Sequence, residues 1–407
     1  MSDMRTQVGI VGAGPAGLLL AHLLHQQGIE SVVLEVRSRA YIEQRVRAGV
    51  LEQGTVDLLT ECGLGERMLR EGLIHHGVEL RFSGRSHRID FDALTGGRGI
   101  TVYGQQEVVK DLLRAREAVG SLPLFEVADV GIDDLTSDRP VVRFTHDGVD
   151  HELRCDVIAG CDGSHGICRP SVPDGELTEF ERTYPFGWLG ILAEVAPSTD
   201  ELIYARHQRG FALHSMRSPT LSRFYLQCEP DADPDDWPDE RIWDELRVRL
   251  DLDLDEGPIV DKGVTPMRSS VVEPMQHGRL YLAGDAAHIV PPTGAKGLNL
   301  ALADIRVLAA ALGPFFADGD DAGLRAYSET CLRRVWRAEH FSWWMTSMLH
   351  RFPDDEGFEE RLQRSQLEYV TSSPAAAASL AENYVGLPFE EPENKSLTYR
   401  GRRSSLR

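Results

Sequence analysis

The sequence predicts an α/β (α+β) fold with a Rossmann-like domain, an inserted mixed β-sheet and a C-terminal helical region. Three observations support this prediction. They are a βαβ pattern in the first 40 residues, β-type segments through the middle of the chain, and helical periodicity after residue 297. A chain of 407 residues is too long for one ordinary core, so two or three domains are expected.

The first βαβ unit has the clearest pattern. The apolar run TQVGIVGAG ends in glycines, LLLAHLLHQQG follows with helical spacing and Gly28 as its C-cap, and SVVLE forms a second strand. The three glycines have separate expected roles. Gly12 makes a tight turn, Gly14 lets the backbone approach a pyrophosphate, and Gly17 lets the helix pack closely on the strand. Glu35 ends the second strand, where a carboxylate can accept two hydroxyls of an adenosine ribose. The alternative is a glycine-rich turn that binds nothing.

The rest of the chain divides by its periodicity. Segments such as GVELRF, VVRFTH and HELRCDVIAGCDG are typical of strands, and the helix WPDERIWDELRVRL interrupts a later β-rich stretch. Aromatic residues in the final helices are expected in the core or at a subunit interface. The expected domains are a nucleotide-binding domain at 1–175 completed by 278–300, a substrate-binding sheet at 176–277, a helical interface region at 278–394, and a disordered basic tail at 395–407.

Composition disfavours several classes of partner and chemistry. The formal net charge of −21 argues against binding to nucleic acids or anionic membranes. Neither a signal-peptide pattern nor a run of about 18 uncharged apolar residues is present, so a cytoplasmic protein without a membrane partner is expected. The six cysteines lack CxxC spacing, which indicates buried thiols and no metal site or disulfide framework. Motifs of zinc proteases, phosphate loops and serine hydrolases are also absent.

Two later motifs place an acid beside a glycine after an apolar strand. They are CDG at 161–163 and GDAAHIVPPTGAKGLNLA at 284–301. Asp162 is as compatible with an ordinary turn as with a cofactor contact, whereas Asp285 precedes an expected helix and is the stronger candidate. Together with GAGPAG and Glu35, these motifs resemble the three fingerprints of the FAD-dependent aromatic hydroxylases that have a single flavin domain.

The resemblance extends over about residues 5 to 390, because RVRAGVLEQG, TVYGQ, ELIYARHQRGFALHSMRS and FSWWMTSMLHRFP also match this family. It implies FAD as cofactor, NADH or NADPH and O2 as co-substrates, and 4-hydroxybenzoate as the small-molecule substrate, hydroxylated at C3. It also implies a homodimer. A hydroxylase of another benzoate, a flavin oxidase and a non-catalytic flavin-binding protein are the alternatives.

The resemblance also implies a path for the substrate's phenol proton. A ring carbon ortho to a phenol becomes more nucleophilic when the phenol ionises, yet a phenol with a pKa near 10 is mostly neutral at pH 7. By resemblance, Tyr204 accepts this proton, Tyr384 continues the chain and His75 forms its solvent-side end. Pro292 would present its carbonyl to the substrate or to the flavin pocket. Taken alone, each tyrosine would more often be a core residue.

The segment HSMRSPTLSRFY independently suggests a carboxylate site. Ser215, Arg217 and Tyr225 occupy alternating or near-alternating strand positions, so their donors can face one cavity. Arg217 can hold a carboxylate through two parallel hydrogen bonds. A solvated polar strand face is the alternative. The expected substrate-binding set is Tyr204, Ser215, Met216, Arg217, Tyr225 and Pro292.

FAD is expected to lie against a larger set of residues. Leu298 and Asn299, at a helix start, would face the flavin ring, where the positive helix end favours the reduced anion. Lys296 would add positive charge without an assigned contact. The full set is Gly12, Gly14, Gly17, Glu35, Arg45, Val46, Arg47, Ala48, Gly49, Val50, Gln105, Asp162, Arg223, Asp285, Leu298 and Asn299.

The nicotinamide cofactor has no Rossmann unit of its own, so it is expected to bind transiently at the surface. The resemblance implies a site near Tyr41, His165 and Arg268. Arg37 or Arg39 could pair with a 2′-phosphate, and an ordinary surface charge is the equal alternative for either. The segment EVRSRAYIE differs from the form in strictly NADPH-dependent relatives. The sequence therefore predicts that NADH is used at least as well as NADPH.

Overall fold

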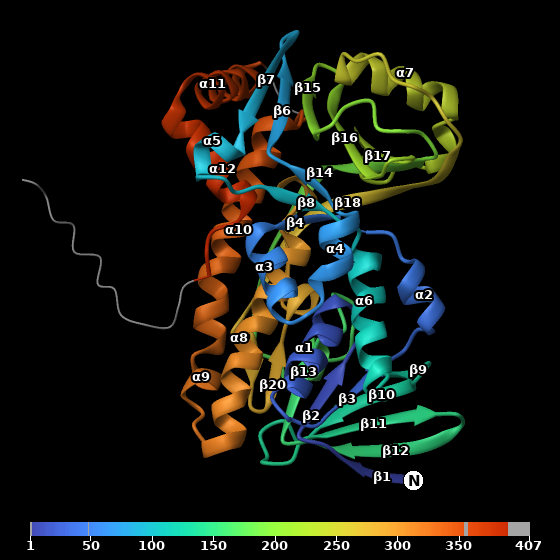
Figure 1. Cartoon of the computed structure of the whole chain (residues 1–407), viewed down its shortest axis with the longest axis vertical. Helices are drawn as coiled ribbons and strands as arrows, with labels where there is room; N and C mark the ends of the chain where they lie inside the picture. Colours follow the sequence, from blue (N-terminus) through green and yellow to red (C-terminus); the bar gives the residue numbers. More distant parts are fainter. Residues whose placement is uncertain (1, 48, 354–356, 390–407) are drawn as a thin grey trace, which may run out of the picture.

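The computed structural model describes residues 2–47, 49–353 and 357–389. Figure 1 shows an elongated molecule in which a parallel sheet and long helices form the lower part, while a larger sheet with α7, α11 and α12 forms the upper part. The expected basic tail at 395–407 and Ala48 lie outside the described residues.

A six-stranded sheet forms the centre of the lower part, in the order β19-β20-β13-β2-β3-β9. Its strands pair in parallel, apart from the antiparallel β19–β20 pair. All residues of β2 and β13 are buried, as expected for strands covered on both faces. The strands are β2 (Val8–Val11), β3 (Ser31–Glu35), β9 (Leu124–Phe125), β13 (Val157–Gly160), β19 (Gln276–His277) and β20 (Leu280–Leu282).

The predicted βαβ unit is confirmed as β2, α1 (Pro15–Gln26) and β3. Gly12 has a φ of +104° and Gly28 a φ of +72°, which favour glycine at the turn and just past the helix end. A β-carbon on Gly17 would lie 1.9 Å from the Gly12 carbonyl oxygen. Only glycine therefore lets α1 approach the turn this closely.

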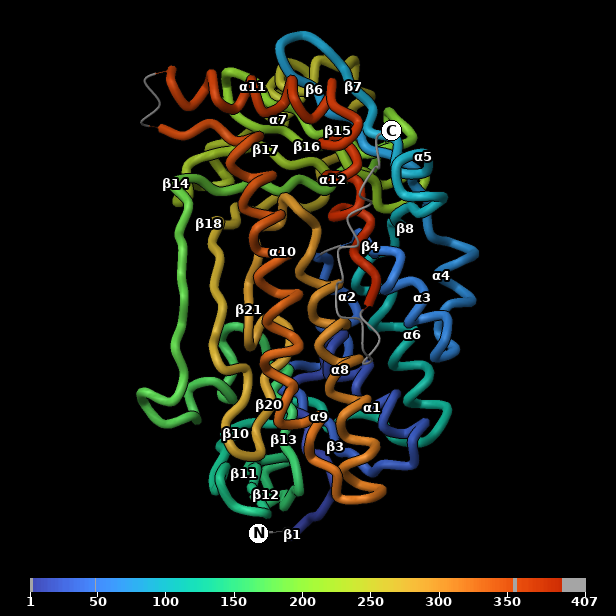
Figure 2. The backbone as a smooth tube through the Cα atoms, turned by 90° about the vertical axis from the view of Figure 1, so that its left-hand side faces the viewer, coloured from blue at the N-terminus to red at the C-terminus, as the bar shows by residue number. Residues whose placement is uncertain are grey.

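An eight-stranded sheet dominates the upper part, in the order β21-β18-β14-β17-β16-β15-β6-β7. Figure 2 shows β14 and β18 running down toward the lower part. The β6–β7 hairpin joins through the parallel pairing of β6 with β15, so the sheet takes strands from both sides of the expected boundary at residue 175. The strands are β6 (Gly77–Phe82), β7 (Arg85–Asp90), β14 (Thr178–Ala193), β15 (Ile203–His207), β16 (Gly210–Ser218), β17 (Leu221–Cys228), β18 (Ile259–Glu273) and β21 (His288–Ile289).

Two small sheets contain the remaining strands of the described chain. One has the order β4-β8-β5 and joins β4 (Val50–Glu52), β8 (Ile100–Val102) and β5 (Leu73–His75). The other has the order β1-β12-β11-β10 and joins β1 (Ser2–Arg5), β12 (Val149–Arg154), β11 (Val141–His146) and β10 (Ala128–Asp133). The short helices around them are α2 (Arg39–Gln44), α3 (Gln53–Glu61), α4 (Gly65–Glu71) and α5 (Phe91–Thr95).

The remaining helices are distributed over both parts of the molecule (Figure 1). The predicted helix before residue 251 is confirmed as α7 (Asp239–Leu250), and the helical final third as α8 (Gly297–Asp318), α9 (Ala322–Arg325), α10 (Tyr327–Leu349), α11 (Phe358–Ser372) and α12 (Pro374–Val385). The sequence interpretation did not include α6 (Gln105–Ala118), which packs on α1. Figure 2 shows α8 and α10 side by side.

Helix α8 is long and apolar enough to cross a membrane by length and composition alone. It packs against α1 and α10, and its residues Leu302, Ile305, Leu308 and Leu312 are fully buried. Its apolar character is therefore accounted for by its place in the core. The six cysteines are free thiols, and all except the half-buried Cys228 are buried.

Candidate active site

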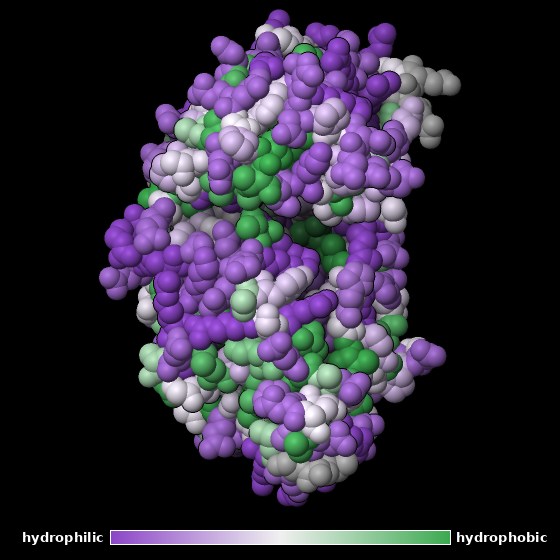
Figure 3. Space-filling view, turned by 90° about the vertical axis from the view of Figure 1, so that its right-hand side faces the viewer, coloured by the Kyte–Doolittle hydropathy of each residue, from purple (hydrophilic) through white to green (hydrophobic). Residues whose placement is uncertain are grey.

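One face of the eight-stranded sheet gathers most of the predicted substrate residues. Tyr204 on β15 stands opposite Leu213 on β16, which stands opposite Tyr225 on β17. Ser215 lies two residues beyond Leu213 and opposite Arg223. Because opposite residues and residues two apart point to the same side of a sheet, these side chains share one face. Figure 3 shows the surface hollowed between the lower and upper parts, with hydrophobic residues inside.

Two tyrosines meet on this face although 180 positions separate them in sequence. The hydroxyl oxygens of Tyr204 and Tyr384 lie 2.5 Å apart, and both side chains are buried. Burial raises the pKa of both hydroxyls above the ordinary value for tyrosine. Both therefore stay neutral at pH 7, and a neutral hydroxyl can accept one proton while donating its own.

His75 is buried, and neither ring nitrogen has a hydrogen-bond partner within the described chain. Burial lowers the pKa of His75 to about 4, so the ring is neutral at pH 7. Within the described residues, no hydrogen bond joins it to the tyrosine pair. Tyr384 stacks on Phe91, whose amide donates to the carbonyl of His76, the residue after His75, at 2.7 Å. The structure thus brings together two of the three predicted relay residues directly.

Arg217 supplies a partly buried positive charge near the sheet face that carries Tyr204. Its guanidinium donates to Ser215 Oγ at 3.1 Å, to Tyr225 Oη at 3.3 Å and to the Met216 carbonyl at 2.9 Å. Its Nε is buried without a partner among the described residues. Burial opposes ionisation of Tyr225, but Arg217 and Arg223 together bring the pKa of Tyr225 below its ordinary value. Arg223 is paired with Asp261 at 3.3 Å, whereas the hydrogen bonds of Arg217 within the described chain all go to uncharged oxygens. The charge of Arg217 and its free Nε–H therefore suit a carboxylate ligand.

Residues 45–47 and 49–52, called the wall segment below, run between the sheet face and the lower part. The Arg47 carbonyl accepts from Arg217 at 3.5 Å, and a β-carbon on Gly49 would lie 3.2 Å from the Arg217 Cζ. Asn299, at the start of α8, donates to the Val50 carbonyl at 3.0 Å and accepts from the Glu52 amide at 2.9 Å. The wall segment is therefore held from both sides.

Arg47 also forms an ion pair with Asp285, at 3.5 Å between Nη1 and Oδ2. This contact brings the predicted cofactor residues of the wall segment and of the later GD motif together. Val46 is half-buried, and Arg45 is exposed with its guanidinium over the ring of Tyr41. Gln105 begins α6 directly after Gly104.

Lys296 has specific contacts that the sequence interpretation did not assign. Its buried ammonium donates to Glu52 Oε1 at 2.6 Å, to the Tyr384 carbonyl at 3.2 Å and to the Asn383 carbonyl. Burial lowers its pKa, and the charge of Glu52 opposes that shift. Lys296 therefore ties β4 to the end of α12 and fixes the position of Tyr384. The sequence did contain a signal for this role, because Lys296 stands within a glycine-rich and otherwise mostly apolar segment.

The loop before α8 forms the remaining side of the site. Pro292 is exposed on a 3-10 turn that spans Pro292–Gly294, and Ala295 has a left-handed φ of +54°. Leu298 and Asn299 are buried in the first turn of α8, whose N-terminus has no side-chain cap. Its free backbone N–H groups give this end a partial positive charge.

The residues around the glycine-rich turn fit the expected FAD. A β-carbon on Gly14 would meet no atom within 4 Å, so backbone is open to a ligand at the N-terminus of α1, which carries no side-chain cap. Glu35 accepts from the Ala13 amide at 2.7 Å and the Arg37 amide at 2.8 Å. Each carboxylate oxygen keeps a lone pair for a ribose hydroxyl.

Asp162 has a local structural role in its own loop. Its Oδ2 accepts from the Cys168 amide at 2.8 Å, while Oδ1 is buried without a partner in the described part of the chain. Burial raises its pKa above the ordinary value for an aspartate. These contacts favour the turn interpretation over a direct cofactor contact.

The predicted nicotinamide residues have different surroundings within the described part of the chain. Arg37 lies over the exposed ring of Tyr41, 5.3 Å from its centre. Arg39 instead binds two carboxylates, Glu43 at 2.9 Å and Glu117 at 3.1 Å. His165 is exposed in the loop after Asp162, and Arg268 on β18 pairs with Glu181 at 3.3 Å.

Comparisons with known proteins agree with this architecture. Residues 5–342 match the family described as FAD binding domain. The p-hydroxybenzoate hydroxylase of Acinetobacter baylyi is 51% identical over 98% of this chain and 99% of its own. The "Probable NADH-specific resorcinol 4-hydroxylase" of Rhodococcus jostii is 28% identical over 79% of this chain and 61% of its own. A p-nitrophenol 4-monooxygenase structure from Pseudomonas putida, 19% identical, covers 95% of this chain and 100% of its own with a TM-score of 0.81.

Proposed function

Because the chain belongs to the FAD-binding-domain family of flavin-dependent aromatic hydroxylases, we propose that it hydroxylates 4-hydroxybenzoate at C3. The co-substrates would be NADH or NADPH, a proton and O2, and the products would be 3,4-dihydroxybenzoate, oxidised coenzyme and water. The observation that carries this proposal is the buried Tyr204–Tyr384 hydroxyl pair, 2.5 Å apart, on the same sheet face as Arg217. A ligand with a phenol at one end and a carboxylate at the other matches this arrangement.

FAD, when bound, supplies the activation of oxygen, and the protein supplies position and proton transfer. Arg217, Ser215 and Tyr225 would hold the substrate carboxylate. The phenol would then donate its proton to Tyr204 Oη as Tyr204 donates its own to Tyr384 Oη. Tyr384 would in turn release its proton toward the neutral ring of His75, the predicted solvent-side end of the relay. The resulting phenolate is electron-rich at the carbon ortho to its oxygen, and burial of both tyrosines keeps bulk water away from the reacting ring.

FAD would be held at both ends by backbone and charge. The open turn at Gly14 and the N-terminus of α1 would take the pyrophosphate, and Glu35 the adenosine ribose. Arg47 and Asp285 would lie along the sugar and phosphate groups. The uncapped N-terminus of α8, at Leu298 and Asn299, would face the flavin ring.

The assay for this function is substrate-dependent coenzyme oxidation with product identification. The purified protein is expected to be yellow, and 4-hydroxybenzoate should accelerate NADH or NADPH oxidation while 3,4-dihydroxybenzoate forms in near-equal amount. Peroxide formation without that product would reject the hydroxylase in favour of a flavin oxidase. Acceleration only by a different hydroxylated benzoate would redirect the substrate assignment.

We expect NADH to be used at least as well as NADPH. Arg39 already binds Glu43 and Glu117, and these carboxylates would repel a 2′-phosphate. The nearby cations that remain in the described segment are Arg37 and Arg45, which both lie over the ring of Tyr41. The measurement is kcat/KM for each coenzyme at saturating 4-hydroxybenzoate. An advantage of about a hundredfold for NADPH would overturn this expectation.

We also propose a cytoplasmic homodimer in which a second copy covers an aromatic patch on α10. Trp336 and Trp343 are exposed on this helix, and Phe180 on β14 packs edge-on against Trp336 at 5.8 Å. Exposed aromatic side chains of this size are typical of interfaces. Light scattering should give a molar mass twice that of one chain. The double variant Trp336→Ser, Trp343→Ser should lower the measured mass toward that of one chain. A monomeric mass for the unchanged protein would contradict the proposal.

A further inference from the structure

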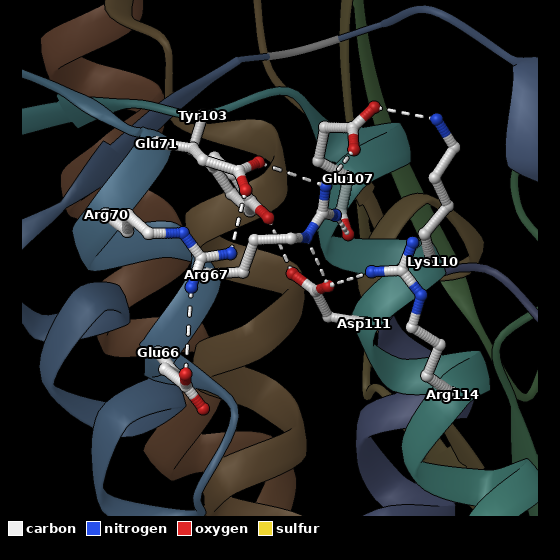
Figure 4. A network of polar contacts seen from close by, with 9 residues as sticks. All are labelled: Glu66, Arg67, Arg70, Glu71, Tyr103, Glu107, Lys110, Asp111 and Arg114. Carbon is white, nitrogen blue, oxygen red and sulfur yellow. Dashed lines mark hydrogen bonds and ion pairs between the residues drawn. The ribbon is translucent and has the colours of Figure 1, made fainter.

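Arg67 on α4 is the centre of a polar network that joins α4 to α6 (Figure 4). Its Nε donates to Asp111 Oδ1 at 2.7 Å. Its two terminal nitrogens donate to the Glu107 carboxylate at 2.5 Å and to the Glu107 carbonyl at 2.9 Å. The guanidinium also lies over the ring of Tyr103, 5.4 Å from its centre. One arginine thus joins α4, α6 and the residue after β8.

Asp111 links Arg67 to the hydroxyl of Tyr103. Its second oxygen, Oδ2, accepts from the Tyr103 hydroxyl at 2.6 Å. Burial and the Asp111 charge raise the pKa of Tyr103, so the hydroxyl remains a donor. Burial alone would lower the pKa of Arg67, but its hydrogen bonds to Asp111 and Glu107 raise it, so the guanidinium stays protonated at pH 7. Both oxygens of Asp111 therefore have fixed donors, and the ring of Tyr103 is held at its outer end.

Tyr103 connects the network to the candidate flavin site through its backbone. Its amide donates to the Gly49 carbonyl at 2.8 Å, and Gly49 lies against Arg217 on its other side. The next two residues are Gly104 and Gln105, which begin α6. A shift of Tyr103 would therefore move both the wall segment and the predicted flavin contact Gln105.

We propose that Arg67 is a positioning residue for FAD, acting through Asp111 and Tyr103 on Gly49 and Gln105. The inference rests on the proposed contacts of Gly49 and Gln105 with FAD, and it is independent of the substrate's identity. Arg67 itself touches no part of the expected flavin path. It sets the spacing between the wall segment and the start of α6, two backbone segments on which the bound flavin would rest.

Burial distinguishes Arg67 from ordinary surface arginines. Exposed ion pairs contribute little because water screens them and long side chains lose entropy. The side chains of Arg67 and Asp111 are only 18% and 12% exposed, whereas those of Arg70 and Arg114, which also join the network, are 60% and 61% exposed. Arg70 and Arg114 therefore serve as matched controls with the same charge.

The test is titration of FAD into the FAD-free full-length protein, followed by quenching of flavin fluorescence. Arg67→Met and Tyr103→Phe are each expected to raise the Kd for FAD by about threefold to tenfold. The double variant should raise it by less than the product of the two, because both act through Asp111. Arg67→Lys should recover part of the affinity, and the flavin absorption spectrum of the loaded variants should change. Arg70→Gln and Arg114→Gln should stay within about twofold of the unchanged protein.

Thermal unfolding of the FAD-free variants separates positioning from general stability. A lower Tm with an unchanged Kd for both Arg67→Met and Tyr103→Phe would overturn the proposal, as would equal weakening by Arg114→Gln. If Arg67→Met fails to fold, Tyr103→Phe decides alone, because it removes only one hydroxyl. Failure of the unchanged protein to bind FAD would instead count against the proposed function.

Discussion

Replacing Arg217 with alanine is expected to raise the Kd for 4-hydroxybenzoate by at least about 30-fold, or about 2 kcal/mol. Its guanidinium bonds only uncharged oxygens among the described residues, at Ser215, Met216, Tyr225 and Arg47, so its charge is available to a ligand. A carboxylate that enters this partly buried position would lose its charge-assisted partner in the variant. The measurement is a binding titration of 4-hydroxybenzoate with the FAD-loaded protein.

Two controls make the result specific. Arg217→Lys keeps the charge but cannot form two parallel hydrogen bonds, so its affinity should lie between those of the alanine variant and the unchanged protein. Ser218→Ala, at the end of the same strand, should leave the Kd unchanged. FAD content must be measured in each variant because Arg217 contacts Gly49. Unchanged affinity of fully loaded Arg217→Ala would remove Arg217 from the carboxylate site.

Replacing Tyr384 with phenylalanine is expected to slow hydroxylation by about 10- to 100-fold while FAD content and the Kd for 4-hydroxybenzoate stay within about twofold. The change removes only the hydroxyl that meets Tyr204, because the Tyr384 ring still stacks on Phe91 and its carbonyl still accepts from Lys296. Without this hydroxyl, Tyr204 has no partner to which it can pass the phenol proton. Rapid mixing with 4-hydroxybenzoate and reduced coenzyme measures the rate of product formation.

The loss of hydroxylation rate in Tyr384→Phe is expected to depend on pH. A free phenol has a pKa near 10, so rising pH ionises more substrate without the relay, and the deficit of Tyr384→Phe should shrink toward pH 9. Tyr327→Phe is the matched control, since it removes a buried hydroxyl that donates to the Leu282 carbonyl at 2.8 Å in the lower part of the molecule. A deficit that is equal at every pH, or equal in Tyr327→Phe, would contradict a relay through Tyr384.

The features predicted well from sequence are those whose signal is local. GAGPAG lies between a strand and a helix, and the structure confirms this βαβ unit, with Gly12 and Gly17 at a left-handed turn and a close packing contact. Strand alternation also predicted that Ser215 and Arg217 share one site. Arg217 does donate to Ser215 Oγ and Tyr225 Oη, although the β16–β17 register shifts between Met216 and Ser218. The catalytic assignments of Tyr204 and Tyr384 came from resemblance, because an isolated tyrosine carries no signal that separates relay from core.

Other features depended on pairings between distant segments. Periodicity predicted β6 as a strand but could not show that it pairs with β15, and it gave no sign that Lys296 would meet Glu52, 244 positions away. For Asp162 the motif left an ordinary turn and a cofactor contact equally open, and only the structure shows that its carboxylate accepts from the Cys168 amide. Such contacts are absent from any local pattern.

The sequence by itself determined the nucleotide-binding unit, the alternating donors of the sheet face and the helical final third. These depend on backbone conformation and on periodic burial, which neighbouring residues set. Only the tertiary structure decided that the Tyr204 and Tyr384 hydroxyls meet, that Lys296 holds the end of α12, and that Arg67 reaches Gly49 through Tyr103. Each of these needs side chains from separate segments within hydrogen-bond distance, and packing of the whole chain fixes that distance.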